Sequence, residues 1–273
     1  MCEFKEAAPW VATAVVVLFT ITWLTAAIGI EAHAAHKQMR MADTLGCVDT
    51  SHFASVVIVS IDTRRAHKLV KSLSCTHTRP VVLNGTPADK TGCPIPSGKA
   101  GCYHSHLRAL EAASATTGWH LILEDDAIPG RHVLTSPTWF SDIVRRLGSH
   151  VDPSAVVVNL GPNDIRPSAH LFLHHFIQHG TDMLTYLVAG KTPILGGFGT
   201  LTHAYAVTHT GAQTIVDALA MAGCRGAGID TDLRDMRQSH PKTFWRVFDT
   251  DNRGHRAWGL FSQSVHVSGT SGL

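Results

Sequence analysis

The sequence has little charge and lacks the features that mark several common classes of protein. Charged residues make up only 16% of its 273 residues, and its formal net charge is +2. No run of lysine and arginine is interleaved with aromatic residues, so a nucleic-acid-binding surface is not expected. The chain also contains no internal repeat and no low-complexity segment. Its 44% hydrophobic content is that of a globular protein rather than a disordered one.

Cysteines are also few, and no two of them form a CxxC pair. A zinc site built from such pairs is therefore not expected. Cys2 lies before the most apolar segment of the chain, and the other five lie after it, at Cys47, Cys75, Cys93, Cys102 and Cys224. An oxidising compartment would allow one or two disulfides among these five, but their pairing does not follow from the sequence.

The 21 residues from Trp10 to Ile30 are mostly apolar and include no charged residue. As a helix this segment is long enough to cross a bilayer, and Trp10 stands where an interfacial anchor belongs. A cleaved signal peptide is the alternative, although its apolar region would normally be shorter and its leading segment more basic than MCEFKEAAP. We therefore expect a short tail over residues 1–9, a transmembrane helix over 10–30, a stem over 31–52 and a folded domain over 53–273.

Within this domain, segments typical of strands alternate with segments typical of helices. Residues 55–62 are mostly apolar and β-branched, which suits a strand buried on both faces. Apolar residues of 103–114 recur at helical spacing, and Gly118 is expected to end that helix. Further strands are expected over 119–123, 204–208 and 243–248. Residues 79–87 are expected to form a short strand that ends in a turn, and residues 154–164 a strand followed by a loop. The alternation predicts an α/β domain whose central sheet is mostly parallel.

Three adjacent carboxylates, Glu124, Asp125 and Asp126, follow the predicted strand over 119–123. In open α/β sheets, ligands bind beyond the carboxyl ends of the strands. Because three adjacent acids repel one another, a divalent cation such as Mg²⁺ or Mn²⁺ is their simplest partner. An extended backbone would direct Glu124 and Asp126 to one side and Asp125 to the other. A solvated loop or a helix cap is the alternative interpretation of such a triplet.

Five segments of the sequence occur in an order that resembles glycosyltransferase family 25. They are VVIVSIDTRRAHKL, IPSGKAGCYHSHLRAL, LILEDDAIP, AYAVTHTGAQTIV and IDTDLRD. The resemblance covers roughly residues 55–240, and its most specific part is the pattern G-x-x-G-C-x-x-S-H-L-x-A-L followed by L-E-D-D-A. This family includes lipooligosaccharide galactosyltransferases and collagen hydroxylysine galactosyltransferases.

The resemblance implies a GT-A fold, which is an α/β domain that binds a nucleotide sugar. It implies an enzyme that transfers a sugar, typically galactose, from a UDP-sugar to a hydroxyl group with inversion at the anomeric carbon. The acceptor would be a glycan, a lipid or a protein, and Mn²⁺ or Mg²⁺ would bind the diphosphate. An N-terminal anchor before such a domain implies a single-pass membrane protein whose catalytic domain lies in the lumen.

The resemblance also assigns roles to nine residues. Glu124 and Asp126 match an acidic metal-binding segment of the family, with Asp125 between them near the donor. Inversion requires a base that takes the acceptor proton, and for this role the matching residues are Asp230, as first choice, and Asp232. The expected contacts to the donor nucleotide or its phosphates come from Arg64, Arg65, Ser105 and His106.

Simpler interpretations remain open for these residues. His106 could be a hydrogen-bonded core histidine, the two arginines could lie on a solvated turn, and Asp230 could cap a helix. The sequence also departs from the family pattern, with Ser60 at a position that is often Asn and Thr63 inserted before the arginine pair. These departures affect the donor contacts more than the fold.

Two other functions compete with that of a glycosyltransferase. One is a catalytically silent relative that acts as a binding or scaffold protein, although such relatives usually lose acidic positions. The other is a metal-dependent phosphohydrolase, for which His170, His174 and His175 are the available extra ligands. Their spacing has no clear ligand pattern.

Overall fold

The computed structural model describes ten ranges of the chain. They are residues 47–73, 78–87, 97–148, 155–161, 194–196, 202–222, 228–236, 239–240, 242–247 and 260–263. No helix within these ranges is long and apolar enough to cross a membrane. The predicted transmembrane segment over 10–30, the tail before it and most of the predicted stem lie outside the described residues, as do His170, His174 and His175.

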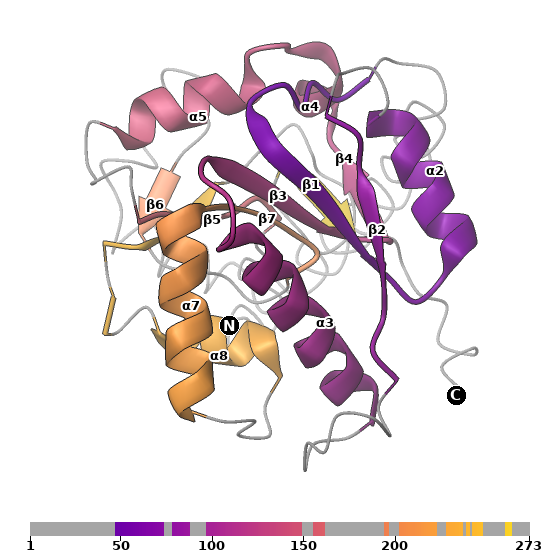
Figure 1. The fold of residues 1–273 in the computed structure, drawn as a ribbon. Coiled ribbons are helices and arrows are strands. Elements are labelled where there is room, and N and C mark those ends of the chain that lie inside the picture. The colour runs from indigo at the N-terminus through magenta and orange to yellow at the C-terminus, as the bar shows by residue number, and fades with distance from the viewer. Residues whose placement is uncertain are drawn as a thin grey trace, which may run out of the picture.

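A seven-stranded mixed sheet forms the centre of the domain (Figure 1). Its strands in spatial order are β2 (Val81–Asn84), β1 (Phe53–Ser60), β3 (Trp119–Glu124), β7 (Ala204–Thr208), β5 (Val157–Asn159), β8 (Phe244–Val247) and β6 (Ile194–Gly196). Strands β1, β2, β3, β5 and β8 point in one direction, whereas β7 and β6 run against their neighbours. The predicted α/β class with a mostly parallel sheet is therefore confirmed. A second, two-stranded sheet pairs β4 (Ala127–Pro129) with β9 (Phe261–Gln263).

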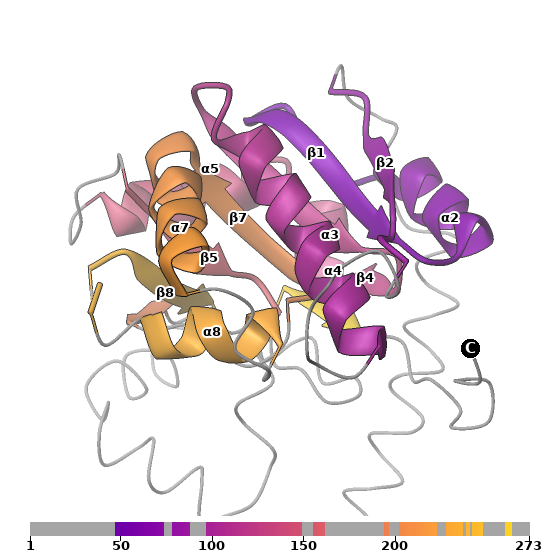
Figure 2. The same cartoon turned by 60° about the horizontal axis from the view of Figure 1, so that its bottom comes forward.

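Helices cover both faces of the central sheet. On one face lie α2 (Thr63–Leu73), α4 (Arg131–Thr135) and α5 (Trp139–Leu147), and on the other lie α3 (Ser97–Ala113), α7 (His209–Ala222) and α8 (Ile229–Met236). Figure 2 shows α3 and α7 side by side over their face, with α8 across their lower ends. Strand β1 packs Val56 and Ile58 into the first layer and Val57 and Val59 into the second. Burial on both faces explains why this strand is apolar at every position in its centre.

The folded domain includes residues 47–52, which the sequence analysis assigned to the stem. Val48 is fully buried in the first layer, and its backbone N–H donates to the carbonyl of Ser72 at 3.0 Å. The indole Nε1 of Trp139 donates to the backbone carbonyl of Asp49 at 2.9 Å. Cys47 is disulfide-bonded. These contacts attach the segment to α2 and α5.

The long helix α3 differs in its bounds from the prediction. It begins at Ser97 and ends at Ala113, so Gly118 does not end it. Instead, Gly118 has a φ of 112° in the turn that leads into β3. A side chain there would be strained by this backbone conformation, and a Cβ would also lie 3.1 Å from the Cβ of Ala54.

The order of the strands reverses around β1. The chain leaves β1 through α2 to reach β2 on one side, and then leaves β2 through α3 to reach β3 on the other side. The carboxyl ends of β1 and β3 therefore form a topological switch point, which is where open α/β sheets bind their ligands. The acidic triplet lies at this point.

Candidate functional site

The acidic triplet lies where β3 ends, and two of its three residues are buried there. Glu124 is the last residue of β3, and Asp125 and Asp126 form the turn between β3 and β4. Asp125 is 8% exposed and Asp126 is 6% exposed, so neither is a solvated loop residue. Carboxylates that lose contact with water need hydrogen bonds or opposite charges, and Asp125 and Glu124 obtain these in different ways.

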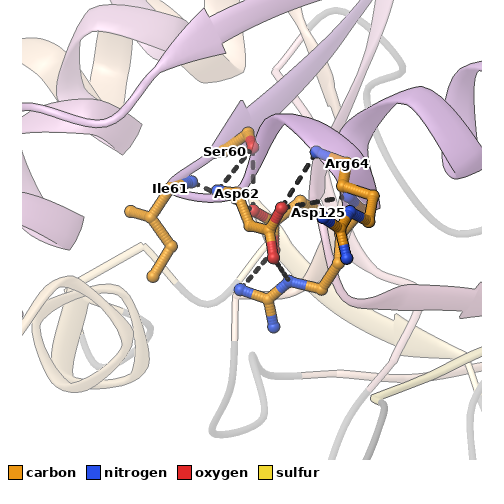
Figure 3. A network of polar contacts seen from close by, with 6 residues as sticks. Ser60, Ile61, Asp62, Arg64 and Asp125 are labelled. Carbon is orange, nitrogen blue, oxygen red and sulfur yellow. Dashed lines mark hydrogen bonds and ion pairs between the residues drawn. The ribbon is translucent and has the colours of Figure 1, made fainter. Parts of the chain in front are cut away.

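Asp125 is neutralised by the connection between β1 and α2 (Figure 3). Its Oδ2 atom accepts hydrogen bonds from the hydroxyl of Ser60 at 2.8 Å and from the backbone N–H groups of Ile61 at 3.0 Å and Asp62 at 2.9 Å. Its Oδ1 atom lies 3.2 Å from Nη2 of Arg65. Asp125 therefore ties the end of β3 to the end of β1.

Asp62 lies directly before α2 and takes part in the same network. Its Oδ1 atom accepts hydrogen bonds from the backbone N–H groups of Arg64 at 2.9 Å and Arg65 at 3.3 Å, which is the geometry of a helix N-cap. These bonds lower the pKa of Asp62, and the nearby arginine charges lower it further. Arg65 lies between Asp62 and Asp125 and pairs with both, whereas Arg64 is exposed.

Glu124 is held on the opposite side of the sheet by α3 and by a residue just before β7. Its Oε1 atom accepts a hydrogen bond from the hydroxyl of Thr202 at 2.8 Å and lies 3.0 Å from Nε2 of His106. The other ring nitrogen of His106, Nδ1, lies 3.1 Å from the hydroxyl oxygen of Tyr205. His106 and Tyr205 are fully buried, and the side chain of Glu124 is 23% exposed.

The contact between Glu124 and His106 is an ion pair. Burial raises the pKa of Glu124, but the hydrogen bond from His106 and its charge outweigh this effect and bring the pKa to about 2. Burial lowers the pKa of His106, but its contacts with Tyr205, Cys102 and Glu124 raise it well above the ordinary value. Both nitrogens of His106 have protein partners, so the structure favours the interpretation of a core histidine.

His203 lies near both Glu124 and Asp126. Burial lowers the pKa of His203, and the negative charges of Glu124 and Asp126 oppose this shift. Its Nε2 atom lies 3.2 Å from the carbonyl oxygen of Phe261, and a Cβ added at Gly161 would collide with the imidazole ring. His203 therefore lies close enough to both carboxylates for their charges to act on its ring, and the expected shared orientation of Glu124 and Asp126 stays a prediction.

Sequence reasoning missed His203. No motif contains it, and it is one of 19 histidines in the chain. The available signal was weak: His203 stands directly before the strand predicted over 204–208. Only the pairing of β3 with β7 brings it to the acidic triplet.

Ser105 connects α3 to the residues that follow β2. Its hydroxyl donates to the carbonyl of Gly101 at 2.6 Å and accepts a hydrogen bond from the N–H of Thr86 at 2.8 Å. A Cβ at Gly101 would lie 2.6 Å from the carbonyl oxygen of Thr86, so the helix needs glycine for this approach. The hydroxyl of Ser105 thus has a structural role, and its expected contact with a donor stays a prediction.

The two candidate bases lie in the first turn of α8, beside α3. Gly228 precedes them with a φ of 102°, and its carbonyl accepts the N–H groups of Thr231 and Asp232. Burial raises the pKa of Tyr103, and the charge of Asp232 raises it further, which places Asp232 near the first half of α3. Asp230 is partly exposed. Their catalytic roles stay predictions.

The site thus has two parts, one on each side of β3. We call the group formed by Ser60, Asp62, Arg65 and Asp125 the α2 network, and the group formed by His106, Glu124, Thr202 and Tyr205 the α3 network. Searches for related proteins found no family model that matches this sequence and no match among curated proteins.

Proposed function

We propose that this protein is a metal-dependent glycosyltransferase that transfers a hexose, with galactose as first choice, from a UDP-sugar to a hydroxyl of a glycan, lipid or protein. The proposal includes a GT-A-like arrangement of the described domain. One observation carries it: an acidic triplet, in which Asp125 and Asp126 are buried, lies at the carboxyl ends of β1 and β3, where the strand order reverses. Two of the motifs that resemble glycosyltransferase family 25, VVIVSIDTRRAHKL and LILEDDAIP, include the ends of these two strands.

In this proposal Glu124 and Asp126 hold the cation. The negative charges of both residues act on His203. Glu124 is ionised at neutral pH because its pKa is about 2. Carboxylate oxygens are the ligands that Mg²⁺ and Mn²⁺ prefer. When bound, such an ion would stabilise the negative charge that develops on the departing diphosphate.

The two arginines have different roles in this proposal. Arg64 is exposed at the start of α2 and is free to reach a diphosphate that lies beyond β1 and β3. Arg65 is held by Asp62 and Asp125, so it positions the turn of the α2 network instead of binding the donor. Asp230, partly exposed beside α3, is our first choice for the base that takes the acceptor proton, with Asp232 second.

The test is transfer and hydrolysis of a panel of UDP-sugars by the purified full chain, with and without Mn²⁺. We expect turnover of at least one donor that requires the ion. Asp126→Asn should abolish both turnover and Mn²⁺-dependent UDP binding, and Asp217→Asn, which changes an exposed carboxylate of α7, should leave both unchanged. Asp230→Asn should reduce turnover by about 10²-fold or more while UDP still binds.

A second candidate function, nucleotide binding without catalysis, is favoured by the protein partners of the carboxylates in the α2 and α3 networks. Asp125 and Glu124 already have protein partners, so two of the three carboxylates also serve the fold. A catalytically silent nucleotide-binding protein would keep them for that reason alone. Binding of UDP without turnover of any sugar donor would support this alternative, and the absence of both binding and turnover would overturn both.

A further inference from the structure

A free thiol adjoins the α3 network. Cys102 lies one helical turn before His106 on α3 and is a free cysteine, partly exposed. One ligand atom from each of Cys102, His106 and Glu124 can be chosen so that all three lie within 4.8 Å of one another. Sulfur, nitrogen and oxygen donors from two elements, α3 and β3, thus converge on one point.

These three donors suit a zinc-like ion. Zn²⁺ binds thiolate sulfur at about 2.3 Å, imidazole nitrogen at about 2.0–2.1 Å and carboxylate oxygen at about 2.0–2.2 Å. Ligand atoms of a tetrahedral site are therefore about 3.5 Å apart. The Nε2 atom of His106 and the Oε1 atom of Glu124 are 3.0 Å apart, so they need to separate only slightly to admit an ion.

The partners of these ligands are also those of a metal site. A metal-binding histidine usually donates its second ring N–H to a fixed acceptor, and a metal-binding carboxylate usually has its own hydrogen bond. With Nε2 on the ion, Nδ1 of His106 would keep its contact with the hydroxyl of Tyr205. Glu124 would keep the hydrogen bond from Thr202. Neither contact requires a new partner.

We infer that Cys102, His106 and Glu124 form a binding site for Zn²⁺ or a similar thiophilic divalent ion, with three protein ligands and a fourth position open to solvent. Cys102 and Glu124 are partly exposed and His106 is buried, so the ion would enter from the side of the first two. On binding, the thiol proton of Cys102 and the proton between Nε2 of His106 and Glu124 pass to solvent. The ion then takes the place of these two protons, with bonds to the sulfur of Cys102, to Nε2 of His106 and to the carboxylate of Glu124.

This site is distinct from the one in the proposed function, although both use Glu124. The proposed function needs Asp126 and an ion that prefers oxygen ligands, whereas the new site needs Cys102 and an ion that accepts sulfur. The inference does not require the protein to be a glycosyltransferase. Substitutions of Asp126 and Cys102 therefore test the two separately.

Titration of the reduced full chain with Co²⁺ tests the inference, because Co²⁺ is a spectroscopic substitute for Zn²⁺. We expect a sulfur-to-cobalt charge-transfer band in the near ultraviolet and strong visible bands of a tetrahedral ion, both at one equivalent, and loss of both when Zn²⁺ is added. Cys102→Ser should remove the near-ultraviolet band. Tyr205→Phe should weaken Co²⁺ binding by about 10- to 100-fold through loss of the contact with Nδ1.

Two controls separate this site from its surroundings. Asp126→Asn should leave the near-ultraviolet band unchanged even if it abolishes Mn²⁺-dependent UDP binding. Glu111→Gln, which changes an exposed residue of α3, should change neither the near-ultraviolet band nor Mn²⁺-dependent UDP binding. Circular dichroism shows whether each variant is folded. A near-ultraviolet band that survives Cys102→Ser in the folded protein, or the absence of any tetrahedral spectrum in the unsubstituted protein, would overturn the inference.

Discussion

The α2 network and the α3 network give two neighbouring carboxylates opposite surroundings. Asp125 accepts hydrogen bonds from one hydroxyl and two backbone N–H groups and pairs with Arg65, a group that stays charged at any ordinary pH. Glu124 instead depends on His106, whose charge can change, and lies beside a free thiol. The comparison indicates that the first network holds the two strand ends together. The second contains ligand atoms, on His106 and Glu124, that can give up their contact with each other to bind an ion.

The largest effect on stability is expected from removal of the Asp125 carboxylate. Asp125→Ala leaves Arg65 without its buried partner and two backbone N–H groups without an acceptor, so the free energy of unfolding should fall by about 3–5 kcal/mol. Chemical denaturation measures this fall. The control, Asp217→Ala on the exposed face of α7, should change the free energy by no more than about 0.5 kcal/mol. Equal effects of the two substitutions would mean that the α2 network does not hold the strand ends together.

The α3 network should respond to acid. Because the pKa of Glu124 is about 2 in the folded protein and 4.5 is its ordinary value, its charge contributes stability above pH 4.5 that is lost as the pH falls toward 2. The loss should be about 3 kcal/mol. Comparison of denaturation curves across this range with those of Glu124→Gln isolates the contribution, since the variant has no such carboxylate. Parallel pH profiles of the two proteins would contradict the predicted ion pair.

The features predicted from the sequence are those that local pattern determines. Residues 55–62 and 119–123 have the composition of buried strands, and the structure has β1 over Phe53–Ser60 and β3 over Trp119–Glu124. The alternation of side chains along a strand also predicted that Glu124 and Asp125 would point to opposite sides, and their partners on α3 and α2 agree with this. Such features depend on residues that are adjacent in the chain, so strand composition and side-chain alternation are enough to predict them.

The features that were missed depend on long-range pairing. Tyr205 reaches His106 across 99 residues, and Thr202 reaches Glu124 across 78. Both contacts exist because β7 runs antiparallel to β3, a direction that alternating strands and helices do not predict. The role of Asp62 as a helix cap was missed for another reason. The sequence analysis assigned a role to Arg64 and Arg65 but none to Asp62, which accepts hydrogen bonds from their backbone N–H groups.

The two arginines that follow β1 should separate structure from function. Arg65→Ala leaves Asp125 buried without its cation and should cost about 2 kcal/mol of unfolding free energy, reduced from a fully buried pair because the arginine is 29% exposed. Arg64→Ala should cost no more than about 0.5 kcal/mol, since that side chain is exposed. If the proposed function holds, Arg64→Ala should nevertheless weaken UDP binding more than Arg65→Ala does. Isothermal titration with UDP and denaturation of both variants give the comparison, and the reverse ranking in either assay would exchange the two roles.

Ser105 provides the smallest and most specific test of how far the donor site extends along α3. Ser105→Ala leaves the N–H of Thr86 without its acceptor and should cost about 1 kcal/mol of unfolding free energy. Because its hydroxyl already donates to Gly101 and accepts from Thr86, we expect no change in Mn²⁺-dependent UDP binding. Ser114→Ala, at an exposed serine just after α3, is the matched control for loss of one hydroxyl. A loss of UDP binding in Ser105→Ala alone, measured well below its unfolding temperature, would place the donor against the first half of α3 and restore the role that the family resemblance implies.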